Sequence, residues 1–282
     1  MRSKNCTLQD FYDNAATAPP EFRFLSPTVL ETWSMETAQW LCTGKNICEI
    51  GSGNGSLALR TMETCVTPLH YLLVDISQTM LNVAKNKLSK KNNSLIEFQY
   101  IRADIEKRLP YELCRNKADR LIAVNVLQDV NINSALKNIR KMLNPDGEFQ
   151  ATFISKESQD VFWKDNPGYD RLNGLWHAGS QYHQNKKCEP LGYCNVDGRK
   201  KPFYRLLHCY TREVIHYSFN LAGFEVLSIE PIIYPVEYVL KRWSSKYHFM
   251  KLNKNQIKLL KEENGYSDGW SVKAKVSESV SP

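Results

Sequence analysis

The sequence predicts an α/β fold in which a mostly parallel sheet of seven strands carries helices on both faces. Three observations point to this fold. Apolar segments of strand length alternate with segments of helical period from residue 46 onward. The apolar segments are nearly continuous, as in strands whose two faces are both buried. A glycine-rich turn joins the first strand to the helix after it, and 282 residues with 42% hydrophobic content suffice for a large core.

Two helices are expected before the sheet. The first, TLQDFYDNAATA, opens with Thr7 and has Asp10 three positions later, close to a capping box, and a Pro-Pro pair ends it. The second, SPTVLETWSMETAQWL, has Ser26 as its N-cap and Pro27 at its first helical position. Residues 1–44 are therefore expected to form a helical lid or flank beside the sheet.

The sheet is expected in seven segments bounded by turn or helix signals. In chain order these segments are NICEI, LHYLLVD, IEFQYIRAD, ADRLIAVNV, EFQATFIS, FEVLSIEPI and GWSVKAKV. The expected helices are a segment from about Ser56, SQTMLNVAKNKLSK, NSALKNIRKML, TREVIHYSFNLAG and the lysine-rich NKNQIKLLKEEN. A turn is expected at NPDG, before the fifth strand. The core thus takes residues 45–155 and 210–276, and residues 277–282 are expected to be a disordered tail.

Residues 156–209 interrupt this alternation and are expected to form an inserted, aromatic-rich cap. The segment mixes glycine, asparagine and proline without a clear period, yet it holds too many aromatic side chains for a disordered linker. These aromatics favour either a planar or cationic ligand, bound by stacking or cation–π contact, or a small aromatic core that packs on itself. The cap also holds three candidate bases, His177, His183 and, in an apolar run, His208.

Composition narrows the class of protein further. No apolar run approaches the roughly 18 residues of a membrane span, and the first residues lack the pattern of a secretory signal, so a cytoplasmic protein is expected. The eight cysteines are scattered without a CxxC pair, which indicates reduced thiols and no metal site. The net charge is +7, but the lysines concentrate in runs that carry no nucleic-acid-binding motif, so a nucleic-acid partner is not expected.

The stretch ICEIGSGNGSLALR, residues 47–60, places Gly51, Gly53 and Gly55 between a strand and a helix. Exposed backbone N–H groups and a helix N-terminus at the carboxyl edge of a parallel sheet form a nucleotide site. A dinucleotide fingerprint would need its third glycine one position after Gly55, and a P-loop would need a lysine after the glycines. Both of these phosphate-binding loops are therefore excluded.

The stretch resembles the first motif of class I S-adenosylmethionine-dependent methyltransferases, E/D-x-G-x-G-x-G, which begins here at Glu49. Further motifs of that family follow in order, with Asp75 ending the second strand in LLVDIS and Asp104 in IRADIEKRLP. The resemblance covers residues 45–155 and 210–235. It implies a Rossmann-like fold and S-adenosyl-L-methionine as the cofactor, whose ammonium, sulfonium and diol suit acidic side chains and bare backbone.

By this resemblance two carboxylates hold the nucleoside, Asp75 the ribose hydroxyls and Asp104 the adenine amino group. Ile76 and Ile105 sandwich the adenine, and Asn125 lies beside the methionine part. The residues implied for cofactor binding are Tyr12, Glu49, Gly51, Ser52, Gly53, Gly55, Asp75, Ile76, Met80, Asp104, Ile105 and Asn125.

Taken alone, the same residues leave plainer roles open. The glycines can form a tight strand-helix turn, Asp75 can be a helix N-cap and Asp104 a surface carboxylate. Tyr12, which by resemblance closes over the methionine carboxylate, can be a packing residue on an amphipathic helix.

The methyl acceptor is less determined than the cofactor. Transfer from a sulfonium is an in-line displacement, so alignment and exclusion of water can supply most of the catalysis. A base is needed only where the acceptor must lose a proton, and His177 and His183 rank ahead of His208 as candidates. The chain lacks N/D-P-P-Y/F after the fourth strand, which argues against methylation of nucleic-acid amino groups, and it has Gln128 where many small-molecule members have histidine.

The leading hypothesis is therefore transfer to an oxygen, nitrogen or carbon atom of a natural-product or metabolic small molecule. A methyltransferase that acts on RNA or protein is the first alternative. A non-catalytic module that binds S-adenosylmethionine is the second.

Overall fold

The computed structural model describes residues 7–17, 31–91, 93–165, 168–178, 192–196, 199–203, 205–234, 236–243, 253–263 and 266–277. Five parallel strands form the centre of its main sheet, in the order β3-β2-β1-β4-β5. They are β1 (Asn46–Ile50), β2 (Leu69–Asp75), β3 (Ile96–Arg102), β4 (Ala118–Ala123) and β5 (Leu143–Ser155). The strand order reverses between β1 and β4, and open α/β sheets bind ligands beyond the carboxyl ends of strands at such a point.

Two long antiparallel strands complete the predicted set of seven. β12 (Tyr266–Val276) pairs with β5, and β11 (Phe224–Tyr234) pairs with β12. The prediction of a mostly parallel α/β sheet is confirmed, with antiparallel pairing confined to strands beyond β5.

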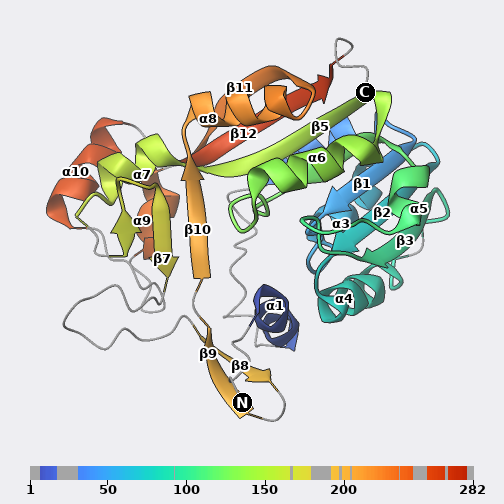
Figure 1. Ribbon diagram of the computed structural model, residues 1–282, viewed down its shortest axis with the longest axis horizontal. Coiled ribbons are helices and arrows are strands. Elements are labelled where there is room, and N and C mark those ends of the chain that lie inside the picture. The colour runs from blue at the N-terminus through green and yellow to red at the C-terminus, as the bar shows by residue number, and fades with distance from the viewer. Residues whose placement is uncertain are drawn as a thin grey trace.

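Three further strands extend the sheet from the carboxyl end of β5. β10 (Arg205–Tyr210) pairs there in parallel, β7 (Leu175–Ala178) pairs with β10, and β6 (Tyr169–Asp170) pairs with β7. β8 (Gly192–Val196) and β9 (Arg199–Phe203) form a separate hairpin below β10 (Figure 1). Part of the range predicted as a cap thus continues the sheet.

The prediction of a turn before the fifth strand at NPDG is wrong in its position, because these residues lie inside β5. Leu143 already pairs with Ala118, and regular pairing resumes where Glu148 pairs with Arg120 after a shift of register. The irregular stretch holds Pro145, which has no N–H to give to a strand ladder.

Helices cover both faces of the sheet, as predicted. On one face α2 (Glu31–Leu41), α3 (Ser56–Thr64) and α4 (Gln78–Leu88) bury residues such as Leu41, Met62 and Leu81 against β1 and β2. On the other face lie α5 (Tyr111–Arg115), α6 (Ile132–Met142) and α8 (Arg212–Leu221), which bury residues such as Leu113, Ile139 and Phe219. The two faces therefore have separate apolar cores.

A third apolar cluster lies at the far end of β5, beside β7 and β10 (Figure 1). It is formed by α7 (Lys156–Phe162), α9 (Val236–Trp243) and α10 (Lys254–Glu262) together with the extension strands. Its buried side chains include Phe162, Cys209 and Leu260.

The N-terminal helix α1 (Leu8–Thr17) contacts both α4 and the hairpin strand β8. Its predicted capping box is present, because the Thr7 backbone N–H donates to Asp10 and the Asp10 backbone N–H donates to the Thr7 hydroxyl. The predicted start of the second helix at Ser26 lies outside the described residues. Within the described ranges, no helix combines the length and apolar character needed to cross a membrane.

Candidate functional site

The glycine-rich turn between β1 and α3 folds back over the end of β2. The N–H groups of Gly51 and Ser52 both donate to the Val74 carbonyl, at 2.7 and 3.1 Å. Gly51, Gly53 and Gly55 have φ angles of 66°, 51° and 70°, in the left-handed region that side chains other than glycine rarely adopt. The turn thus needs glycine at these positions before any ligand is considered.

The three glycines differ in what surrounds them. A Cβ on Gly51 would lie 2.2 Å from Cγ2 of Val126, and one on Gly55 would lie 2.9 Å from the Cβ of Ala84. A Cβ on Gly53 would meet nothing closer than the Gly51 carbonyl oxygen at 4.0 Å. Packing against the protein therefore accounts for Gly51 and Gly55, whereas Gly53 leaves open space above the turn.

Asp75, at the end of β2, braces this turn. Its Oδ2 accepts a hydrogen bond from the Gly53 N–H and its Oδ1 accepts one from the Ser77 N–H, both at 2.8 Å. Burial raises the pKa of Asp75, while the hydrogen bonds from Ser77 and Gly53 oppose that rise. The N-cap of α4 is Ser77, whose hydroxyl accepts from the Met80 N–H, so Asp75 itself is not the cap.

Glu49 lies beneath the turn and is only 5% exposed. Its Oε2 accepts a 2.8 Å hydrogen bond from the Tyr71 hydroxyl. Burial raises the pKa of Glu49 to about 8, although the Tyr71 hydrogen bond favours the ionised form. Without a cationic ligand, the Glu49 carboxyl therefore stays largely protonated near neutral pH.

The raised pKa of Glu49 predicts that the ligand-free protein loses stability as the pH rises from about 4.5 to about 8. In this window the folded protein keeps a proton on Glu49 that the unfolded chain releases, so each rise in pH favours unfolding. Replacing Glu49 with glutamine removes this part of the slope and keeps an oxygen for the Tyr71 hydroxyl. We expect the unfolding free energy of E49Q at pH 8 to exceed that of the parent by a few kcal/mol, because each unit of pKa shift corresponds to about 1.4 kcal/mol.

Urea unfolding of the parent and E49Q at several pH values measures this difference. Glu225→Gln, at a carboxylate that pairs with Lys275 on the surface of β11, is the matched control and should leave the slope unchanged. Parallel pH profiles for the parent and E49Q would contradict the prediction.

The remaining residues predicted for the cofactor lie around the same edge. Ile76 and Met80 are half-buried just beyond Asp75, and Ile105 is buried after β3 with its carbonyl accepting from the Asn138 side chain at 2.8 Å. Asp104 accepts from the Glu106 N–H at 3.0 Å and pairs with Lys107 at 2.9 Å. These contacts leave the adenine contact of Asp104 a prediction.

Asn125 is the second residue after β4 and has a φ angle of 54°, which is unusual for a residue other than glycine. Its N–H donates to the Thr152 hydroxyl at 2.8 Å, and the same hydroxyl lies 3.3 Å from its Oδ1. Such backbone strain is often found at functional sites, and here it marks the carboxyl end of β4 next to the glycine turn.

Sequence reasoning missed Asp13, which fixes α1 at this edge. Asp13 Oδ1 accepts from the Ser77 hydroxyl at 2.5 Å and from the Thr79 N–H at 3.3 Å. Tyr12, the neighbouring residue predicted to close over the cofactor, is half-buried with its ring 5.3 Å from that of Phe11. The helix therefore sits over the start of α4, and the acidic position three residues beyond the N-terminal capping box was the available signal.

The residues at this edge fit S-adenosylmethionine. Gly53 leaves room for a ligand, and the buried Ser52 hydroxyl has no hydrogen-bond partner among the described residues. A carboxylate can accept about four hydrogen bonds, so Asp75 retains capacity for two ribose hydroxyls after its two backbone contacts. Together with Glu49 it supplies the negative charge that a cationic cofactor needs.

The three candidate bases differ in where the structure places them. His177 lies in β7, where its backbone is in register with Leu206 of β10. His183 lies outside the described residues. His208 lies in β10, and its backbone N–H donates to the Gln128 carbonyl at 2.9 Å.

Comparison with known proteins identifies the family of the chain. A family model described as a methyltransferase domain matches residues 42–191. The methylphloroacetophenone synthase of Cladonia uncialis is 27% identical over 174 residues, which are 60% of this chain and 6% of that protein. The ubiquinone/menaquinone biosynthesis C-methyltransferase UbiE of Bartonella quintana is 28% identical over 129 residues, 44% of this chain and 48% of that protein. The chain thus spans less than half the length of either relative.

Solved structures share the fold over most of the chain. The CcbJ methyltransferase from Streptomyces caelestis matches with a TM-score of 0.55 at 14% identity, covering 97% of this chain and 97% of that one. The magnesium protoporphyrin IX methyltransferase ChlM from Synechocystis PCC 6803, solved with bound SAH, matches with a TM-score of 0.52 at 12% identity, covering 88% and 84%. Because the family model also matches more than half of the 282 residues, the chain belongs to the methyltransferase domain family, in its class I S-adenosylmethionine-dependent form.

Proposed function

We propose that this chain transfers the methyl group of S-adenosylmethionine to an oxygen, nitrogen or carbon atom of a small molecule. The observation that carries the proposal is the glycine turn itself, with open space at Gly53 and a buried carboxylate, Asp75, braced beside it. The printed names of two relatives, a methylphloroacetophenone synthase and a C-methyltransferase of ubiquinone/menaquinone biosynthesis, support a small-molecule acceptor.

In this proposal the bound cofactor supplies an electrophilic methyl group on a sulfonium. The protein's own residues bind and orient. Asp75 accepts from the ribose hydroxyls, Glu49 contributes negative charge beneath the turn, and Ile76 and Ile105 flank the adenine. The helix α1, tied to α4 through Asp13, limits the access of water to the same edge.

The proposal is tested by calorimetry followed by a transfer assay. We expect S-adenosylmethionine and S-adenosylhomocysteine both to bind, and label from a methyl-labelled donor to appear in at least one member of a panel of phenols, β-dicarbonyls and amines. An absence of binding at millimolar ligand would overturn the methyltransferase assignment. Label that enters bulk RNA or protein, with no transfer to small molecules, would overturn the small-molecule acceptor; steep loss of transfer with added salt would mark the RNA case.

A further inference from the structure

One face of β10 carries His208 and Tyr210. Alternate residues of a strand point to opposite faces. Cys209 packs into the apolar cluster of α7, α9 and α10, whereas Tyr210 packs into the core that α6 and α8 share. His208, two residues before Tyr210, lies on the Tyr210 side, and the two rings stack with centroids 6.1 Å apart. Leu206, two residues before His208, is 43% exposed.

A short segment connects this face of β10 to the glycine turn. Val126 sits against Gly51, where a Cβ would collide with it at 2.2 Å. Two residues later, the Gln128 carbonyl accepts from the His208 N–H at 2.9 Å. The Tyr210 hydroxyl donates to the carbonyl of the intervening residue, Leu127, at 3.3 Å. The segment after β4 therefore touches the cofactor turn on one side and β10 on the other.

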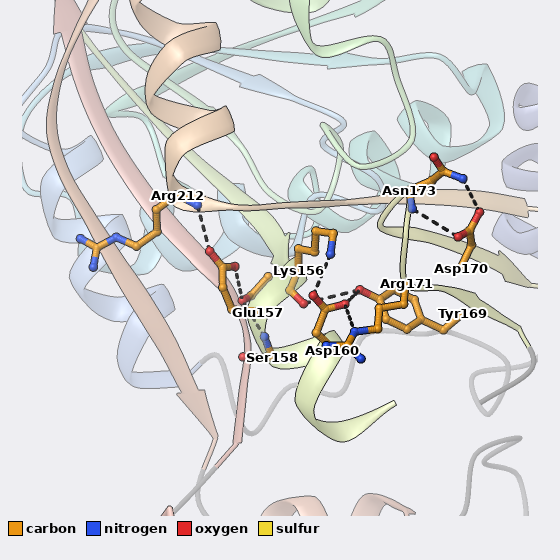
Figure 2. A network of polar contacts seen from close by, with 10 residues as sticks. Lys156, Glu157, Ser158, Asp160, Tyr169, Asp170, Arg171, Asn173 and Arg212 are labelled. Atoms are coloured by element: carbon orange, nitrogen blue, oxygen red, sulfur yellow. Dashed lines mark hydrogen bonds and ion pairs between the residues drawn. The ribbon is translucent and has the colours of Figure 1, made fainter. Parts of the chain in front are cut away.

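Further hydrogen bonds hold β10 and the neighbouring extension strands in place. The Cys209 N–H donates to the Gly174 carbonyl at 2.7 Å. Just beyond β10, the Arg212 N–H donates to Glu157 of α7 at 3.1 Å, and Asp160 of the same helix accepts from the Tyr169 hydroxyl at 2.7 Å (Figure 2). A side chain on such a strand is positioned more accurately than one on a loop, as a catalytic group requires.

The imidazole of His208 is not engaged by these contacts. Of the three histidines whose side chains are described, His70 lies 3.0 Å from Glu97 and His216 lies 3.0 Å from Asn220. His208 is half-buried, and within the described residues neither of its ring nitrogens has a hydrogen-bond partner. Gln128, whose backbone carbonyl accepts from the His208 N–H, also has a buried side-chain Oε1 without a hydrogen-bond partner in the described part of the chain. His208 and Gln128 thus both carry side-chain polar atoms without hydrogen-bond partners among the described residues.

We infer that His208 is the catalytic base of the methyl transfer, an inference that rests on the proposed function. An imidazole nitrogen of His208 takes the proton of the acceptor, and the freed electron pair of the acceptor atom forms a bond to the methyl carbon. The bond between that carbon and sulfur breaks with its pair left on sulfur, which yields neutral S-adenosylhomocysteine. The imidazolium then releases the proton to solvent.

Several other titratable groups of the described residues lie around this face. Tyr210 stacks on His208, and its pKa is raised by burial, so its phenol stays protonated. Asp129, in the segment after β4, and Glu106, after β3, are the carboxylates that act on Tyr210. On β7, the strand paired with β10, His177 is the titratable residue.

The inference can be tested without knowing the acceptor, because S-adenosylmethionine carries a sulfonium charge that S-adenosylhomocysteine lacks. Protein labelled with carbon-13 at histidine Cε1 is titrated by NMR between about pH 5 and 8, where imidazoles change charge. If His208 faces the transferred methyl group, the nearby cation disfavours its protonation. We expect its midpoint to lie lower with S-adenosylmethionine than with S-adenosylhomocysteine by at least about half a unit.

His70 and His216 provide internal controls, because both are already paired elsewhere on the molecule and their midpoints should not distinguish the two ligands. The His208 signal is assigned by its absence in H208Q. If that variant does not fold, cross-relaxation with the Tyr210 ring assigns the signal instead.

Different outcomes would overturn the proposed function and the role of His208. Failure of both ligands to bind would sink the proposed function. Binding of both with an identical His208 midpoint would overturn the base alone. With any acceptor found in the screen, H208Q should lower kcat roughly 100- to 10,000-fold while the Kd for S-adenosylhomocysteine stays unchanged.

Discussion

Replacing Asp75 with alanine is expected to weaken the binding of S-adenosylhomocysteine about 10- to 150-fold, which corresponds to about 1.5 to 3 kcal/mol. The substitution removes the carboxylate proposed to hold the ribose, and it also frees the Gly53 and Ser77 N–H groups that Asp75 now accepts from. Both losses act on the cofactor turn. Calorimetry on the folded variant measures the change.

Asp119 offers a matched control for this prediction, because it is also a partly buried carboxylate that accepts from two backbone N–H groups. Its Oδ2 accepts from Lys45 and Asn46 at 3.0 and 2.9 Å, at the opposite edge of the sheet. D119A should therefore reduce stability and leave cofactor affinity unchanged. Asp75→Asn removes the charge while keeping one acceptor oxygen. Full affinity in D75A would show that the ribose does not lie at Asp75.

Replacing Gly51 with alanine should reduce the unfolding free energy by about 2 to 5 kcal/mol. The left-handed φ of 66° costs about 1 to 2 kcal/mol for alanine, and the new Cβ must also displace Val126 from 2.2 Å, an overpacking cost of about 1 to 3 kcal/mol. Chemical denaturation of the ligand-free protein measures the loss.

Gly53→Ala is the control that separates these two costs, because Gly53 has a similar φ of 51° but open space around it. G53A should lose only the backbone part, about 1 to 2 kcal/mol. Adding Val126→Ala to G51A should recover part of the packing cost, as a double-mutant cycle would reveal. Equal losses in G51A and G53A would contradict the proposed clash.

The sequence predicted those parts of the fold whose signals are local. β1, β2 and β4 are short, nearly continuous apolar runs, and the capping box of α1 lies within four residues. β6 and β7, with two and four residues, and β10 escaped prediction because none of them shows a hydrophobic period. Their pairing depends on partners distant in the chain, which no local pattern encodes.

The site divides in the same way. A motif of seven residues predicted Glu49 and the glycines as site residues, and the end of a strand predicted Asp75. The contact of Asp13 with Ser77 joins residues 64 positions apart, and the acidic residue in α1 gave no indication of that distant partner. His208 was one of three candidate bases in the sequence, which left its position relative to the glycine turn undetermined. The hydrogen bonds from its backbone to Gln128 and from Tyr210 to Leu127 connect β10 to the segment beside the glycine turn.

At Ile154 the sheet forks. On one side this residue of β5 is in register with Gly269 of β12, and on the other with Cys209 of β10. β10 shares two register pairs with β5, the second at Ser155. The described strands of the extension therefore join the central sheet only at the carboxyl end of β5. Insertions or replacements within the extension would disturb few pairings of the central sheet. Such an attachment lets the sequence of the extension vary while the edge that carries the glycine turn keeps its strand pairing.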